Sequence, residues 1–266
     1  MARNDRAVFD KFKDRIYASF EWIERQRAKS KKIENCIEGL MPPMQASDWP
    51  EVNQVWLTDY LSCEGMLEAA KCFKVFGDER ADKMILACED YKKAIKTAVE
   101  DTPDYDEDEF LIGAKSNVKG LPLEDPFVSS MSTSLILFAD IGVIDQNSEL
   151  LIKHKNYLRN RNIIQNGLHL IMHACAETSH TPNNPWIGYC YYTTFIDFAW
   201  FDHYLAIGDK ENAYEVLKGQ LKFSMSPEYQ CVERYSANDP YFVPWQPNAS
   251  ANGRIIDMLC SWYGEN

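Results

Sequence analysis

WLTDYLSCEGMLEAAKCFKVFGDERAD (residues 56–82) and IGYCYYTTFIDFAWFDHYLAIGDKENA (residues 187–213) decide the fold of this chain. Each is a long apolar stretch followed by Gly-Asp, two charged or polar residues and an Ala-containing helical run. Gly77 and Gly208 can adopt the left-handed conformation that ends a helix, and the aspartate after each can accept hydrogen bonds from the free N–H groups that begin the next helix. The phrase predicts two antiparallel helices joined by a short turn. Its repetition predicts a fold assembled from helical hairpins.

The composition narrows the classes of partner. The chain has 266 residues, an apolar fraction of 45% and a formal net charge of −12. Scattered Lys and Arg in an acidic chain argue against a nucleic-acid partner. We expect no membrane partner either, because no apolar run reaches the roughly 18–20 residues that span a bilayer. The N-terminal MARNDRAVFDKF lacks the apolar core of a signal peptide. A complete chain is thus expected to be cytoplasmic, and a fragment could be secreted or periplasmic.

The eight cysteines form no CxxC pair, so zinc-ribbon and thioredoxin-like interpretations have no support. Most lie among apolar neighbours, where a free thiol behaves as a small hydrophobe. Reduced structural thiols are favoured over a disulfide framework.

Apolar residues recur at spacings of three and four. The pattern predicts nine helices, over residues 5–29, 53–76, 79–100, 127–140, 147–160, 163–177, 189–207, 210–225 and 250–263. The helices over 53–76 and 189–207 carry apolar groups on most faces, which is typical of helices buried on all sides. The chain thus alternates buried and amphipathic helices, as two concentric layers would require. No domain linker is evident, and a single domain over residues 1–266 is expected.

The loop over residues 226–249 is the best candidate for chemistry. It holds four prolines and crowds aromatic, carboxylate and amide side chains together. Aromatic rings can stack on the apolar face of a sugar while polar groups hydrogen-bond its hydroxyls. The alternative is a proline-stiffened loop that only caps the core.

Here the chain resembles a known group. Val232-Glu233-Arg234-Tyr235, a loop rich in proline and aromatic residues, and then NASANG (residues 248–253) opening the last helix resemble the C-terminal end of six-hairpin glycosidases. These are the (α/α)6-toroid enzymes that include the trehalase, glucoamylase and α-glucosidase I families. GLMPPMQASDW (residues 39–49) before a buried helix is similar to their pattern of a substrate loop and then an inner helix. The resemblance implies an all-α fold, an (α/α) toroid of helical hairpins. Nine helices against the twelve of a closed ring favour an incomplete six-hairpin barrel.

The resemblance also implies catalytic residues. Glu233 matches the general base of an inverting mechanism, and Asp48 is the nearest match to the general acid. Such a mechanism needs one protonated carboxyl and one carboxylate about 6.5–9.5 Å apart. Asp48 could instead cap the helix that follows. Asp59 and Glu64 are rivals for the acid, because both lie near the start of a buried helix where lone carboxylates are costly.

The remaining candidates are sugar contacts. His169, His173 and Glu177 are spaced at i, i+4 and i+8, which places them on one face of a helix. We favour a polar stripe that faces the pocket or binds backbone carbonyls over a metal site, because a HExxH arrangement is missing. Asp197 is either a buried structural group or a pocket carboxylate, and Asp202 lies on the same predicted helix. No metal or cofactor is expected. The predicted substrate-binding residues are Trp49, Glu177, His180, Trp186, Arg234, Tyr235, Tyr241, Trp245 and Gln246.

These features favour a glycoside hydrolase that cleaves an oligosaccharide or glycoside with inversion. The alternative is a non-catalytic carbohydrate-binding or assembly module built on a truncated toroid. A helical-repeat interaction scaffold is weaker, since such arrays repeat at about 34–47 residues and the chain shows no such period.

Overall fold

The computed structural model describes residues 5–34, 36–45, 52–100, 114–115, 135–160, 164–169, 191–225, 230–231, 234–236 and 249–264. These residues are mostly helical, as the sequence predicts. They belong to two compact units, one containing the described residues up to Lys115 and the other those from Leu135 onward. The predicted single domain over 1–266 stays a prediction.

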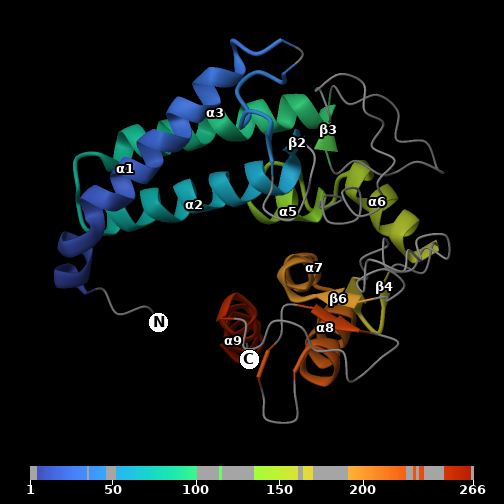
Figure 1. Cartoon of the computed structure of the whole chain (residues 1–266). Coiled ribbons are helices and arrows are strands. Elements are labelled where there is room, and N and C mark those ends of the chain that lie inside the picture. The colour runs from blue at the N-terminus through green and yellow to red at the C-terminus, as the bar shows by residue number, and fades with distance from the viewer. Residues whose placement is uncertain are drawn as a thin grey trace, which may run out of the picture. The chain divides into compact units, whose positions relative to one another are not determined.

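Unit 1 is a helical hairpin with a third helix against it. α2 (Trp56–Val75) and α3 (Ala81–Glu100) form the hairpin, and α1 (Arg6–Ser30) packs on α2 (Figure 1). The strands β1 (Met44–Gln45), β2 (Val52–Val55) and β3 (Ala114–Lys115) form an antiparallel sheet in the order β1-β2-β3. β2 runs directly into α2. Large side chains such as Phe73 and Tyr91 are fully buried between the helices.

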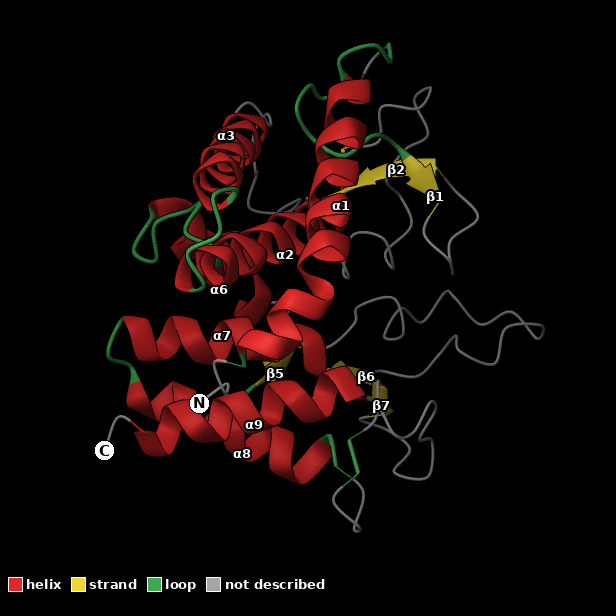
Figure 2. Cartoon of the chain, turned by 90° about the vertical axis from the view of Figure 1, so that its left-hand side faces the viewer, coloured by secondary structure: helices red, strands yellow, loops and turns green. Residues whose placement is uncertain are grey.

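Unit 2 is built around α7 (Thr194–Ala206). α8 (Lys210–Phe223) and α9 (Ala249–Gly264) lie beside it (Figure 2). α5 (Leu135–Asp140) packs on α7, and α6 (Glu149–Asn160) packs on α5. β6 (Tyr191–Thr193) leads directly into α7 and pairs with β7 (Arg234–Ser236). Every residue from Ile196 to Tyr204 except Asp202 is buried, which confirms that α7 is buried on most faces.

The two predicted Gly-Asp turns are confirmed, and they close in the same way. Gly77 and Gly208 have φ values of +67° and +77°. The glycine N–H donates to Lys74 in the first turn and to Leu205 in the second, and the next N–H reaches one residue further back. This paired pattern is the Schellman motif, which satisfies carbonyls that the helix end would otherwise leave free.

Each aspartate then supports the next helix, as predicted. Asp209 is the N-cap of α8 and accepts from the N–H of Asn212 at 3.2 Å. Asp78 accepts from the N–H of Arg80 at 3.1 Å, one residue before α3 begins, and forms an ion pair with its guanidinium.

The helix predicted over 163–177 is wrong for residues 164–169. β4 (Ile164–Gln165) and β5 (Leu168–His169) form an antiparallel hairpin whose turn is Asn166-Gly167. Both turn residues have positive φ, at 54° and 79°, and Asn-Gly is the preferred pair for such a turn. His169 is therefore in a strand, and the predicted helical stripe that begins with it fails. His173 and Glu177 lie outside the described residues.

Three further expectations need correction or limits. The predicted helices over 53–76 and 189–207 begin only at Trp56 and Thr194, because the residues before them form β2 and β6. α2 is not buried on all sides, since Leu61 is 52% exposed. Of the helix predicted over 127–140, the described part is α5.

Six of the cysteines lie in the described residues, and all six are free thiols, as predicted: Cys36, Cys63, Cys72, Cys88, Cys231 and Cys260. Among the described helices, none is both long enough and apolar enough to cross a membrane.

The first prediction concerns two glycines of one hairpin. Gly77→Ala should lower the free energy of unfolding by about 1 kcal/mol, because alanine is strained at a left-handed φ. Gly65→Ala, in the exposed interior of α2, should raise it by about 0.5–1 kcal/mol. An added Cβ meets nothing within 4 Å at either position. Urea unfolding of the two variants measures the difference, and equal effects would contradict the assignment of Gly77 as the helix end.

The second prediction concerns the close packing of the β4–β5 turn on α8. A Cβ at Gly167 would meet the backbone carbonyl oxygen of Glu215 at 2.5 Å. Gly208 has nearly the same φ, and its Cβ would meet nothing. Gly167→Ala should therefore destabilise the chain by about 2 kcal/mol more than Gly208→Ala. Similar losses in thermal unfolding would mean that backbone strain alone acts at Gly167.

Candidate functional site

The described residues reach the predicted site only at its edge. Arg234 and Tyr235 are described by their backbone, in β7. The other predicted catalytic and substrate-binding residues lie outside the described part of the chain: Glu233, Asp48, Trp49, Glu177, His180, Trp186, Tyr241, Trp245 and Gln246.

The strand pairing fixes where β7 lies in unit 2. Arg234 pairs with Thr193, and Tyr235 pairs with Tyr192. Thr193 is the last residue before α7. β7, which begins directly after Glu233 in the sequence, thus lies beside the strand that leads into α7.

The N-terminal end of α2 holds a buried carboxyl group, Asp59. Its side chain is 0% exposed. Oδ1 accepts from the backbone N–H of Met41 at 2.8 Å and from the hydroxyl of Tyr91 at 2.7 Å. Oδ2 has no hydrogen-bond partner among the described residues. Burial raises the pKa of Asp59 to about 7, against the opposing effects of both hydrogen bonds and of the Arg27 charge.

Asp59 is therefore a structural group. A carboxyl with no exposed surface cannot reach a substrate, so of the predicted acids Asp48 and Glu64 are left. Glu64 is half-buried in the next turn of α2.

A second set of contacts fastens the loop that precedes β1. The side chain of Gln54 accepts from the N–H of Ile37 at 2.9 Å and donates to the carbonyl of Met41 at 2.9 Å. The guanidinium of Arg27 donates to the carbonyl of Gly39 at 2.7 Å and lies 4.0 Å above the ring of Tyr91. Arg27 is 4% exposed, and Asp90 at 2.9 Å and Glu24 at 2.6 Å balance its charge. Sequence analysis missed these groups because their partners are backbone atoms distant in the sequence.

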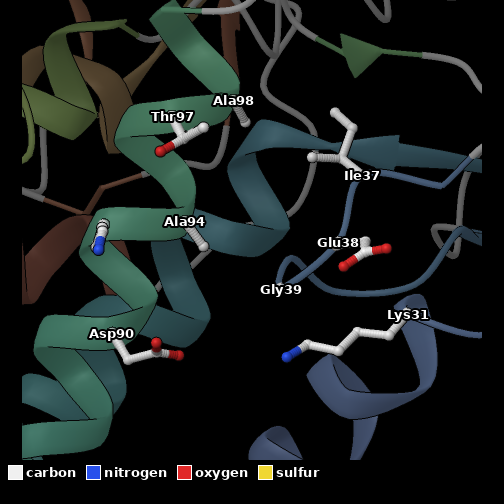
Figure 3. A pocket seen from close by; sticks show the side chains of 9 residues that line it. Lys31, Ile37, Glu38, Gly39, Asp90, Ala94, Thr97 and Ala98 are labelled. Atoms are coloured by element: carbon white, nitrogen blue, oxygen red, sulfur yellow. The ribbon is translucent and has the colours of Figure 1, made fainter.

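The fastened loop forms one wall of a pocket of about 420 Å³. α3 forms the opposite wall, and Lys31 at the end of α1 points into the space between them (Figure 3). Gly39 allows the loop to approach α3 closely, because a Cβ at this position would lie 3.0 Å from Cβ of Ala94. Glu38 and Asp90 also line the pocket.

Unit 2 contains a second buried carboxyl, at the N-terminal end of α7. Asp197 is 0% exposed. It accepts from the backbone N–H of His169 at 2.8 Å and from the side-chain amide of Gln220 at 2.5 Å. Burial raises the pKa of Asp197 well above its usual range, and both hydrogen bonds oppose the rise. Of the two interpretations left open by the sequence, the buried structural group is correct.

Two buried histidines of unit 2, His169 and His203, are neutral at pH 7. Burial lowers the pKa of His169 to about 4, and its ring nitrogens have no hydrogen-bond partner among the described residues. Burial and the charge of Lys155 lower the pKa of His203 to about 4. The Nδ1 atom of His203 lies 2.7 Å from Oε1 of Gln146. Within the described ranges, no group of three or more His, Cys, Asp or Glu side chains could hold a metal ion.

Comparison of the chain with protein-family models, with curated proteins and with solved structures found no match.

The third prediction concerns pH. The pKa of Asp59 is about 7 in the folded chain against 3.8 ordinarily, so the folded state binds this proton more tightly than the unfolded state. Stability from this group is therefore lost as the pH rises from about 4 to about 7. In wild type, ionisation of Asp59 should lower the free energy of unfolding by about 2–3 kcal/mol between pH 5 and pH 8. Asparagine cannot ionise, so the Asp59→Asn variant should not show this decrease.

Urea unfolding at the two pH values measures this loss as the difference between wild type and variant. Asp82→Asn, an exposed residue in the first turn of α3, is the control. An Asp59→Asn variant that keeps the wild-type pH dependence would show that Asp59 does not carry the proton.

Proposed function

We propose that this chain is a carbohydrate-active protein of the hairpin-toroid type that hydrolyses a glycoside with inversion of configuration. Glu233 acts as the general base and Asp48 as the general acid. One observation carries the proposal: the pairing of Arg234 with Thr193 joins the residue after Glu233 to the entry of the buried helix α7. In a toroid of hairpins, the inner-helix ends carry the loops that form the site.

The first unit repeats this connection. Asp48 and Trp49 lie in the chain between β1 and β2, which pair through Met44 and Asn53 and then lead into α2. Each predicted carboxyl is thus next to a short strand pair at the start of an inner helix. This parallel supports a shared role for the two loops and agrees with the resemblance to six-hairpin glycosidases.

The chemistry assigns the carboxyls different charges. The base must be ionised to take a proton from the attacking water, and the acid must be protonated to release the leaving group. Burial or a neighbouring negative charge would raise the pKa of the acid. The aromatic residues would stack on sugar rings, and the polar ones would bind hydroxyls. The stacking set is Trp49, Trp186, Tyr235, Tyr241 and Trp245, and the polar set is Glu177, His180, Arg234 and Gln246.

The fourth prediction tests the base. Wild-type chain screened against aryl glycosides and unmodified oligosaccharides should release product of inverted anomeric configuration, visible by NMR. Glu233→Gln should lose about 10²–10⁴-fold in kcat, the usual contribution of a general base. It should still show the rise in melting temperature that the same sugar gives the wild type.

Glu228→Gln is the matched control, with the same charge change five residues earlier. Equal turnover by Glu233→Gln and wild type would refute the assignment. A sugar-dependent rise in melting temperature without hydrolysis of any glycoside would instead favour the non-catalytic binding module.

A further inference from the structure

The two inner helices begin in the same way. α2 follows β2 and α7 follows β6 without an intervening residue. The fourth residue of α2 is Asp59 and the fourth residue of α7 is Asp197, and both are 0% exposed. A charged residue type at the same place in two helices, buried both times, points to one shared task, because burial of a carboxyl is costly.

Each aspartate also lies on the same side of its helix as the glycine that follows the end of that helix. Asp59 precedes Gly77 by 18 residues, and Asp197 precedes Gly208 by 11. At 3.6 residues per turn these spacings are close to five and three full turns. Aligning the chain on its Gly-Asp pairs places Asp59 opposite Cys190, so the equivalence is hidden in the sequence.

The contacts match as well. Each carboxyl accepts a backbone N–H from the segment that lies before its strand, from Met41 in unit 1 and from His169 in unit 2. Each also accepts from one side chain on the outer helix of its hairpin, from Tyr91 on α3 and from Gln220 on α8. Each aspartate therefore joins three elements: the incoming segment, the inner helix and the outer helix.

We propose that Asp59 and Asp197 are equivalent positioning residues that fix the strands at the entries of α2 and α7. In unit 1 the hydrogen bond from Met41 to Asp59 also positions β1. Pro42 and Pro43 connect Met41 to β1, and their fixed φ makes this connection rigid. In unit 2 the hydrogen bond from His169 to Asp197 holds β5, which lies against β6, and β6 pairs with β7. This inference rests on the proposed function, which gives the reason why these strands must be held in place.

The fifth prediction measures the positioning directly, by hydrogen–deuterium exchange on the full chain. Asp59→Ala removes the acceptor, and amides in residues 37–45 and 52–55 should exchange more than tenfold faster than in wild type. Asp197→Ala should do the same for residues 164–169 and 191–193. Asp59→Asn and Asp197→Asn keep an acceptor oxygen and should restore most of the protection. Asp82→Asn is the exposed control.

Loss of protection confined to these segments supports the proposal. Wild-type exchange there in both alanine variants would overturn it, and so would faster exchange spread evenly over the unit. If the alanine variants do not fold, Tyr91→Phe and Gln220→Leu each remove one donor and keep the aspartate. They should accelerate exchange of the same segments to a smaller extent, and unchanged exchange would again overturn the proposal.

Activity separates this inference from the proposed function. On a glycoside that the wild type hydrolyses, the alanine variants should lose kcat more than they raise KM, and the asparagine variants should recover it. If the wild type hydrolyses none while the exchange pattern is as expected, the proposed function fails and the positioning role stands. If Glu233→Gln is inactive while exchange is unchanged in the alanine variants, the positioning role fails alone.

Discussion

The hydrogen bond from a distant backbone N–H to a buried aspartate is the interaction on which both units depend. The carboxyl group near the start of α2 or α7 must lose its water, and its own helix offers it no hydrogen-bond partner. The N–H of Met41 or His169 supplies one, together with a side chain from α3 or α8. Leaving such a group unsatisfied costs about 1–3 kcal/mol or more. The segment that donates the N–H, the strand before the central helix and the second helix of the hairpin are therefore held in one arrangement around the carboxyl.

Two further side chains of unit 1 also form hydrogen bonds to backbone groups of this loop. Gln54 and Arg27 use side chains to satisfy the backbone of the loop before β1. Arg27 is buried with its charge balanced by acidic partners, and its flat face lies on Tyr91, the residue that also donates to Asp59. Loop backbone that approaches the core is thus paired group by group. This accounting explains why an irregular segment can line a pocket with a defined shape.

Sequence predicted the parts of this fold that local chemistry determines. The Schellman turns at Gly77 and Gly208 were predictable because a left-handed glycine followed by aspartate has few alternatives. The hairpin at Asn166-Gly167 carried an equally local signal, but the spacing of apolar residues over 163–177 favoured a helix. Strands of two to four residues show no alternation and were missed. The roles of Asp59 and Asp197 depend on partners 18 to 32 residues away, which no local pattern reveals. The site proposed at Glu233 and Asp48 rests on resemblance and on strand pairing at its edge.

The unequal lengths of α2 and α7 show how such a hairpin can vary. α2 has 20 residues and α7 has 13, and the difference of seven is close to two full turns. With a rise of about 1.5 Å per residue, this changes the depth of the hairpin by about 10 Å. The carboxyl keeps its direction around the helix axis relative to the turn, whereas inserting one residue would rotate it by about 100°. Depth can therefore change in whole turns during evolution, or by design, without disturbing the end of the helix that receives the loop.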